Sequence, residues 1–277
     1  MKFLKSALSF TKLEFKALKF YPSSFVLSVI QSFVNMGIWL FVSLFLKQYA
    51  KNALSGYNGD FVSYMVIGVI FFQNAGSILT LPFQSLSTAF WDKRLEIYNS
   101  SGSGIWAFLT GKFIWTFVYN LIIQLGILIF AIFVIGIKVN SSISIVSVIV
   151  FYLLFILTCF GIGLIGASNF FYLEVKQGRE PITWLIDVLA RIFSGVYYPI
   201  TVIPISIRFI SYFIPHTYAL QGIRLIMMNG YTLSNPNILR YTCIMMIFCV
   251  VTVFLGIILL NRALIKAQRG NGVGMVV

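Results

Sequence analysis

The chain has 277 residues, of which 59% are apolar and only 10% are charged. An ordinary soluble domain carries about 25% charged residues, and at this length its core cannot bury so much apolar surface. The composition therefore excludes a soluble enzyme and a disordered scaffold, and it predicts a protein embedded in a lipid bilayer. The net charge of +13 is then typical of basic cytoplasmic loops that attract anionic lipid, so we expect a membrane-lipid partner and no nucleic-acid partner.

Residues 1–22 predict an amphipathic helix. On a helical wheel the lysines fall on one side, while Phe, Leu and Ala mostly occupy the rest. The lysines are Lys2, Lys5, Lys12, Lys16 and Lys19. We expect this helix to lie in the cytoplasmic membrane interface. Pro22 ends the pattern, and Ser24 can cap the helix that follows.

Runs of about 20 apolar residues predict transmembrane helices. Six such runs occur, at residues 24–46, 61–81, 105–137, 143–172, 182–203 and 241–261. The stretch 204–230 is also apolar, but Pro204 and Pro215 divide it into pieces that are too short to span, which predicts two external re-entrant helices before the last span. The expected fold class is an all-α polytopic membrane protein that forms a single domain over residues 1–277.

The distribution of basic residues predicts the topology. With the N-terminus inside, thirteen Lys and Arg residues lie on the cytoplasmic side and six on the outer side. This asymmetry predicts six spans with both termini in the cytoplasm. A seventh span at 204–228 would place the basic C-terminal segment outside, which the asymmetry disfavours.

The motifs of common enzymes are missing from the sequence. No G-x-x-x-x-G-K-[ST] motif occurs, His216 is the single histidine, and no two carboxylates share a span. We therefore expect no ATP hydrolysis, no metal site and no cofactor in this chain. Gly161, Gly163 and Gly166 match a dinucleotide-binding pattern, but they lie inside an apolar run, where small residues indicate close helix packing.

A few polar side chains interrupt the predicted spans. Asp187 and Arg191 are four residues apart and share one helix face. They form either an ion pair that lowers the cost of insertion or a pair that exchanges partners as the helix moves. Gln31 and Asn35 share a face of the first span, where they either bond to another helix or line a path for a polar or amphipathic cargo.

The stretch from residue 174 to residue 230 resembles the permease subunits of ABC-2 type transporters. The matching elements are Gly178, Pro181, the run SGVYYP at 194–199, Pro204, Pro215, Thr217, Tyr218, Arg224 and Gly230. The rest of the chain follows the same plan, with a basic N-terminal helix and a charged segment after the second span. The resemblance implies a second permease copy, with a homodimer expected, and two copies of a separate ABC ATPase that uses ATP and Mg²⁺.

The resemblance also implies roles for particular residues. The cytoplasmic segment 90–101 would dock on the ATPase, and the loop 174–180 would be a second contact. The docking residues are then Asp92, Lys93, Arg94, Glu96, Lys176, Arg179 and Glu180. Spans one, two and five would bound the cargo path, with Gln31, Asn35, Tyr197 and Tyr198 as its candidate lining and the broken external helices as its cap.

The function implied is the membrane subunit of an ATP-driven exporter in the cell membrane of a prokaryote. Its cargo would be amphipathic, and a drug, a lipid, a glycolipid and a polysaccharide all remain open. A secondary transporter or channel that ATP does not drive is the alternative, although such proteins usually show repeats or spans broken at mid-membrane. An intramembrane enzyme is disfavoured because the usual catalytic residues are missing.

Overall fold

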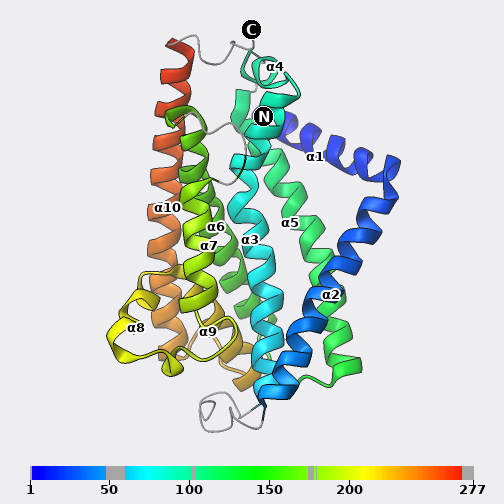
Figure 1. The fold of residues 1–277 in the computed structure, drawn as a ribbon, viewed down its shortest axis with the longest axis vertical. Coiled ribbons are helices and arrows are strands. Elements are labelled where there is room, and N and C mark those ends of the chain that lie inside the picture. Colours follow the sequence, from blue (N-terminus) through cyan, green and yellow to red (C-terminus); the bar gives the residue numbers. More distant parts are fainter. Residues whose placement is uncertain (1, 48–59, 101–103, 174–177, 179, 270–277) are drawn as a thin grey trace.

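The computed structural model describes residues 2–47, 60–100, 104–173, 178 and 180–269, and the regular structure of these residues is entirely helical (Figure 1). The long helices are α2 (Pro22–Leu46), α3 (Phe61–Trp91), α5 (Gly104–Phe130), α6 (Ile145–Tyr172) and α10 (Pro236–Arg269). The shorter ones are α1 (Lys2–Phe20), α4 (Leu95–Ser100), the π-helical turn η2 (Ala131–Ile135), α7 (Pro181–Phe193), the 3₁₀ turn η3 (Ile200–Val202), α8 (Ile205–Tyr212) and α9 (Pro215–Asn229).

Five segments are long and apolar enough to cross a membrane. They are Pro22–Leu46, Phe61–Trp91, Gly104–Ile135, Ile145–Tyr172 and Pro236–Ala267. Helix α7 lies roughly parallel to these helices (Figure 1). It has 13 residues, so it is about 20 Å long and shorter than the hydrocarbon core of a bilayer. The predicted helical membrane protein is confirmed, whereas six crossings stay a prediction.

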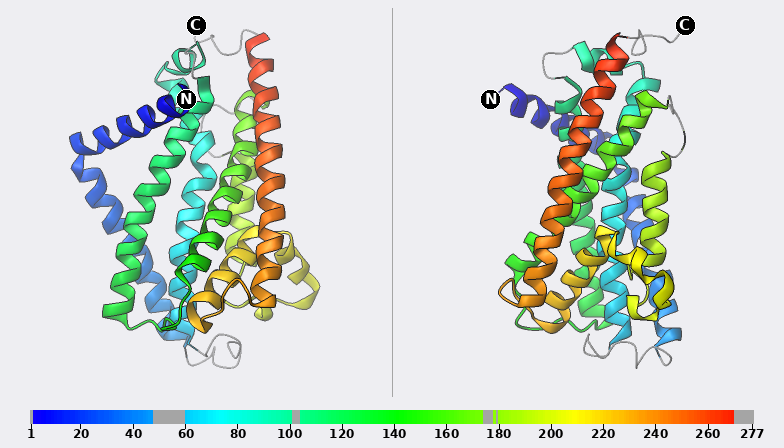
Figure 2. Two further views of the ribbon diagram at one scale, coloured as in Figure 1. Left: turned by 180° about the vertical axis from the view of Figure 1, so that it is seen from behind. Right: turned by 90° about the vertical axis from the view of Figure 1, so that its left-hand side faces the viewer.

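The two ends of the molecule differ. Helix α1 and the last turns of α10 lie at one end, and α8 and α9 lie toward the other (Figures 1 and 2). This arrangement fits the expectation that both ends of the chain face the same side of the membrane. Which side they face stays a prediction.

Two predicted helix ends are wrong. Helix α3 continues past Pro82 to Trp91, although we expected the span to stop at residue 81. A proline inside a membrane helix is tolerated where neighbouring groups compensate for the lost hydrogen bond, and here its ring packs beside Gly163 of α6. The fifth predicted span, 182–203, is helical only to Phe193.

Helix α6 is the centre of the bundle, and its glycines allow three neighbours to approach. A Cβ on Gly161 would lie 2.6 Å from the backbone nitrogen of Val253 in α10, and one on Gly163 would lie 2.5 Å from the carbonyl oxygen of Leu79 in α3. A Cβ on Gly166 would meet the carboxylate of Glu180 before α7. The helix-packing interpretation of the glycine pattern is therefore confirmed.

The stretch 204–230 does form two short helices, but they differ in burial. Helix α8 exposes large apolar side chains such as Ile205 and Phe209. Helix α9 is mostly buried and packs against α3, α6 and α10. Helix α9 therefore belongs to the core of the bundle, and the assignment of both helices as external and re-entrant stays a prediction.

Helix α1 packs closely against α5. Gly111 lets it approach closely, since a Cβ there would lie 2.5 Å from the carbonyl oxygen of Ala7. The Lys112 ammonium lies 2.6 Å from the Glu14 carboxylate, and the Thr11 hydroxyl donates to the Gly111 carbonyl at 3.1 Å. The chain then turns sharply into α2, whose first half stands away from the bundle (Figure 2).

Candidate functional site

Helix α7 stops at a glycine. Gly195 has φ of 75°, the left-handed conformation that ends many helices. The chain then runs without α-helix to η3, so the carbonyl groups at this break lack helical partners. In apolar surroundings such carbonyls need another donor. The guanidinium of Arg224 donates at 2.7 Å to the Gly195 carbonyl and at 2.7 Å to the Val196 carbonyl.

Arg224 of α9 is 0% exposed and contacts both α3 and the segment after α7. Its Nε donates to the carbonyl of Tyr64 in α3 at 3.0 Å. Its guanidinium carbon lies 3.6 Å from the centre of the Tyr64 ring, and the Tyr64 hydroxyl donates to the Gly195 carbonyl at 3.1 Å. A Cβ on Gly68 would lie 1.8 Å from Nη2 of Arg224, so the arginine fits only beside a glycine.

Asp187 and Arg191 form an ion pair on α7. The Nε of Arg191 lies 2.9 Å from Oδ2 of Asp187, and the two side chains are 48% and 23% exposed, respectively. Nη2 donates to Oδ1 at 3.3 Å, and Nη1 donates to the Tyr197 hydroxyl at 3.5 Å. The guanidinium also lies 5.1 Å from the centre of the Phe72 ring, a cation–π contact. Arg191 thus has three kinds of partner within reach.

An aromatic stack connects this network to α2. The rings of Trp39 and Tyr197 lie 3.7 Å apart with an interplanar angle of 18°. Because Tyr197 also accepts from Arg191, a continuous chain of contacts joins α7, the segment after it, and α2.

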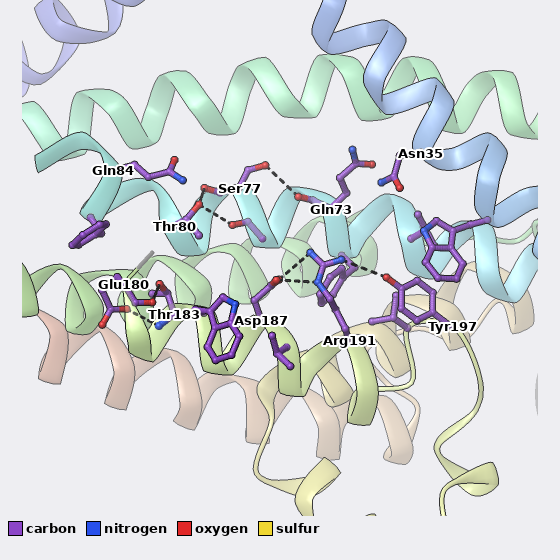
Figure 3. Close-up of a pocket in the computed structure, with 18 of the residues that line it drawn as sticks. Asn35, Gln73, Ser77, Thr80, Gln84, Glu180, Thr183, Asp187, Arg191 and Tyr197 are labelled. Carbon is purple, nitrogen blue, oxygen red and sulfur yellow. Dashed lines mark hydrogen bonds and ion pairs between the residues drawn. The ribbon is translucent and has the colours of Figure 1, made fainter. Parts of the chain in front are cut away.

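The ion pair forms part of the wall of a cavity of about 650 Å³ between α2, α3 and α7. Ligand pockets typically have volumes of about 300–1,000 Å³. Figure 3 shows the polar side chains of α3 facing those of α7 across this space. The polar lining comprises Asn35, Gln73, Ser77, Thr80, Gln84, Glu180, Thr183, Asp187, Arg191 and Tyr197. The described lining contains amides, hydroxyls, aromatic faces, two carboxylates and one guanidinium, which can bond to a polar ligand.

The predicted path residues do not all lie in this cavity. Asn35 and Tyr197 line it. Gln31 instead lines a smaller niche of about 210 Å³ between α2, α3 and α5, together with Asn120. Tyr198 is not in either lining, and its hydroxyl donates to the carbonyl of Ile192.

The predicted docking residues after α3 lie in a turn. Asp92, Lys93 and Arg94 are exposed, and Lys93 adopts a positive φ of 58°. The Nε of Arg94 lies 3.9 Å from a carboxylate oxygen of Asp92. Glu96 follows in α4, but its side chain lies outside the described part of the structure, as do Lys176 and Arg179.

Glu180 has another role from the one predicted. Its side chain is 2% exposed and caps the start of α7, accepting from the backbone N–H of Ile182 at 2.9 Å and of Thr183 at 2.6 Å. The Asn169 amide of α6 also donates to it at 2.6 Å. A carboxylate held in this way is not presented to a partner, so the predicted docking contact is corrected to a helix cap.

The sequence alone missed the polar stripe on α3 and the place of Arg224. Gln73, Ser77, Thr80 and Gln84 are spaced by four, three and four residues, which puts them on one helix face. That spacing could have revealed the stripe. We counted Arg224 as an outer-side charge, although an arginine between apolar residues is also the signal for a buried cation.

The chain was also compared with known proteins. No match was found among the curated proteins. A sequence model of the family described as ABC-2 type transporter matches residues 7–228, a range that includes the turn after α3, the α7 cavity and Arg224. The resemblance inferred from residues 174–230 therefore extends over most of the protein, and the chain belongs to the ABC-2 type transporter family.

Proposed function

We propose that this chain is the membrane subunit of an ATP-driven exporter in a prokaryotic cell membrane. Membership of the ABC-2 family implies a permease that works with an ABC ATPase. We further propose that two copies of the chain and two ATPase subunits form the complex, with ATP and Mg²⁺ bound by the ATPase. The cargo is an amphipathic molecule, and it moves along α2, α3 and α7.

The observation that carries this proposal is the cavity between α2, α3 and α7. A polar cavity is costly in a helical bundle surrounded by lipid unless it serves a polar ligand or pathway. Its wall contains the ion pair of Asp187 and Arg191, and the stack of Trp39 on Tyr197 joins α2 to the segment after α7 at its edge. Separation of that stack would widen the cavity.

The docking turn has a physical connection to the membrane helices. Tyr98 of α4 stacks on Phe108 of α5 at 4.5 Å and meets Phe10 of α1 edge-on at 5.3 Å. A movement of α4 imposed by the ATPase would therefore be passed to α1 and α5. Because α1 continues into α2, the same movement would reach the cavity.

Copurification with a candidate ABC ATPase subunit produced in the same cells tests the docking role. The double variant Lys93→Glu and Arg94→Glu reverses two exposed charges, so it should lose most of the bound ATPase while keeping its thermal stability. Lys138→Glu, an exposed charge at the opposite end of the molecule, is the matched control and should retain the ATPase. Retention by the double variant would show that the turn is not the docking site.

Reconstitution tests the energy source. Vesicles containing the permease and the ATPase should export fluorescent lipid analogues only when ATP and Mg²⁺ are supplied. Equal export by the permease alone would favour a channel or a secondary transporter instead.

A further inference from the structure

The polar stripe on α3 is shared by three neighbouring cavities. A chamber of about 950 Å³ lies between α1, α2, α3 and α5. Ser77, Thr80 and Gln84 line both this chamber and the α7 cavity, and Ser77 also lines the niche near Gln31. The three cavities therefore meet along one face of α3, beneath α2. Figure 2 shows α1 and α2 meeting at a sharp angle at one side of the bundle.

The walls of the chamber are amphipathic. Helix α1 contributes apolar side chains, including Leu13 and Leu18, whereas α3 and α5 contribute hydroxyl groups, including Thr88 and Thr116. A molecule with one polar end and one apolar end matches such a lining. Because α1 is a basic helix expected at the cytoplasmic interface, that molecule would come from the cytoplasmic leaflet.

The charges of the chamber are already paired. The Lys112 ammonium lies 2.6 Å from Glu14, and the Arg94 guanidinium lies 3.9 Å from Asp92. The other residues in the described lining are uncharged. A charged head group that entered the chamber would lose its hydration and would find no unpaired charge of opposite sign, which is unfavourable. Hydroxyl groups, by contrast, can bond to the Ser, Thr and amide side chains.

One donor in this lining has no partner. The amide nitrogen of Asn120 is buried and makes no hydrogen bond within the described structure. Asn120 lines both the chamber and the niche, so its donor lies where the two spaces meet. A buried donor without a partner is rare and costly, and an acceptor oxygen on a bound head group would satisfy it.

We propose that the chamber binds the saccharide head of an uncharged glycolipid taken from the cytoplasmic leaflet. The acyl chains lie against α1, and the head passes beneath α2 along Gln73, Ser77, Thr80 and Gln84 into the α7 cavity. This inference rests on the proposed export function, and it specifies the class of cargo and the place where that cargo is first bound.

Photo-crosslinking of the full chain in lipid nanodiscs tests the binding site. The probe is a diglucosyl diacylglycerol with a diazirine in one acyl chain near the glycerol. We expect crosslinks on α1, α3 and α5. Thr116→Trp places a large ring in the wall of the chamber where the head group would lie, so it should reduce crosslinking by about tenfold. Val118→Trp is the matched control, because Val118 is 41% exposed on the same helix and lines none of the three cavities.

A second variant tests the unpaired amide nitrogen of Asn120 without adding volume. Asn120→Leu removes the amide at similar size, and loss of its hydrogen bond should weaken crosslinking by about three- to tenfold. This variant also keeps the proposal testable if Thr116→Trp fails to fold. Undiminished crosslinking in a folded Asn120→Leu or Thr116→Trp protein would overturn the site.

Competition on the unaltered protein tests the head group. Unlabelled diglucosyl diacylglycerol should compete about tenfold better than phosphatidylglycerol with the same acyl chains, because the charged head lacks a counter-charge. Equal competition would overturn the preference for an uncharged head. Copurification with the ATPase is measured on the same preparations, so loss of ATPase binding would count against the proposed function, whereas intact ATPase binding without crosslinks would count against this inference alone.

Discussion

Two regions of this permease, the break after α7 and the wall of the α7 cavity, each contain one arginine, and the two arginines are held in opposite ways. Arg224 is 0% exposed and bonds to the backbone carbonyls of three residues. Arg191 has a side chain that is 48% exposed and shares its bonds between a carboxylate, a hydroxyl and an aromatic ring. Backbone carbonyls cannot move without moving their helices, whereas side chains can change rotamer.

The comparison assigns different tasks to the two residues. Arg224 fixes the break after α7 against α3 and α9, so we expect it to act as part of the rigid frame. Arg191 faces the cavity and can exchange Asp187 for Tyr197, so we expect it to take part in movement. The predictions below separate a loss of stability from a loss of transport.

The largest effect is expected at Arg224. Arg224→Met removes the donor for the Val196 carbonyl and one of the two donors for the Gly195 carbonyl, whose other donor is the Tyr64 hydroxyl. A buried unsatisfied group costs about 1–3 kcal/mol, and a lost hydrogen bond to a charged group costs a similar amount. The free energy of unfolding should therefore fall by about 2–6 kcal/mol. Arg224→Lys should fail as well, because an ammonium cannot reproduce the planar fork of the guanidinium. Thermal unfolding in detergent measures both, and an unchanged melting temperature would contradict the assigned role.

Single changes in the ion pair should come next. Asp187→Ala or Arg191→Ala leaves one charge without its partner, and a charge at the centre of a membrane helix costs about 2.5–3.5 kcal/mol on insertion scales. Partial exposure to the cavity lowers that cost. Expression of each single variant should fall, and the double variant Asp187→Ala with Arg191→Ala should recover it. A double variant that still misfolds would show that the two residues are not partners.

Gly68→Ala tests the rigid packing of Arg224 by a change in α3. The new Cβ would overlap Nη2 of Arg224, so the free energy of unfolding should fall by about 1–3 kcal/mol. Gly37→Ala in α2 is the control, because no atom lies within 4 Å of a Cβ there. In an Arg224→Met background the cost of Gly68→Ala should shrink. Full additivity of the two changes would argue against their contact.

The smallest effect is expected at Glu180, at the start of α7. Glu180→Ala removes a helix cap, which costs about 0.5–2 kcal/mol. ATPase copurification should be unaffected, because the carboxylate is buried. If the variant instead kept its stability and lost the ATPase, Glu180 would be a docking residue after all.

Helix period and hydrophobicity were enough to predict α2 and α6, since both are long apolar runs with no proline in their interior. They failed at Pro82, because the ring is accommodated by Gly163 of a distant helix. They also failed at Gly195, because the break after α7 depends on a donor from α9. In both cases the deciding contact comes from another helix, which periodicity within one helix does not reveal.

The site was predicted only where its partners are close in sequence. Asp187 and Arg191 are one turn apart, so their pairing could be expected from spacing alone. The stacking of Trp39 on Tyr197 and the burial of Arg224 bring together residues from different parts of the chain. The apolar residues around Arg224 could have indicated that it is buried, but local sequence does not reveal which groups it contacts.

The most direct test of a moving Arg191 is export by the Asp187→Ala and Arg191→Ala double variant, measured beside its ATPase rate. The permease and its ATPase are reconstituted in vesicles, and both rates are compared with those of the unaltered complex. If the pair exchanges partners during transport, the double variant should be well expressed and hydrolyse ATP, yet export slowly per ATP consumed. Normal export per ATP would show that the pair only eases insertion into the membrane.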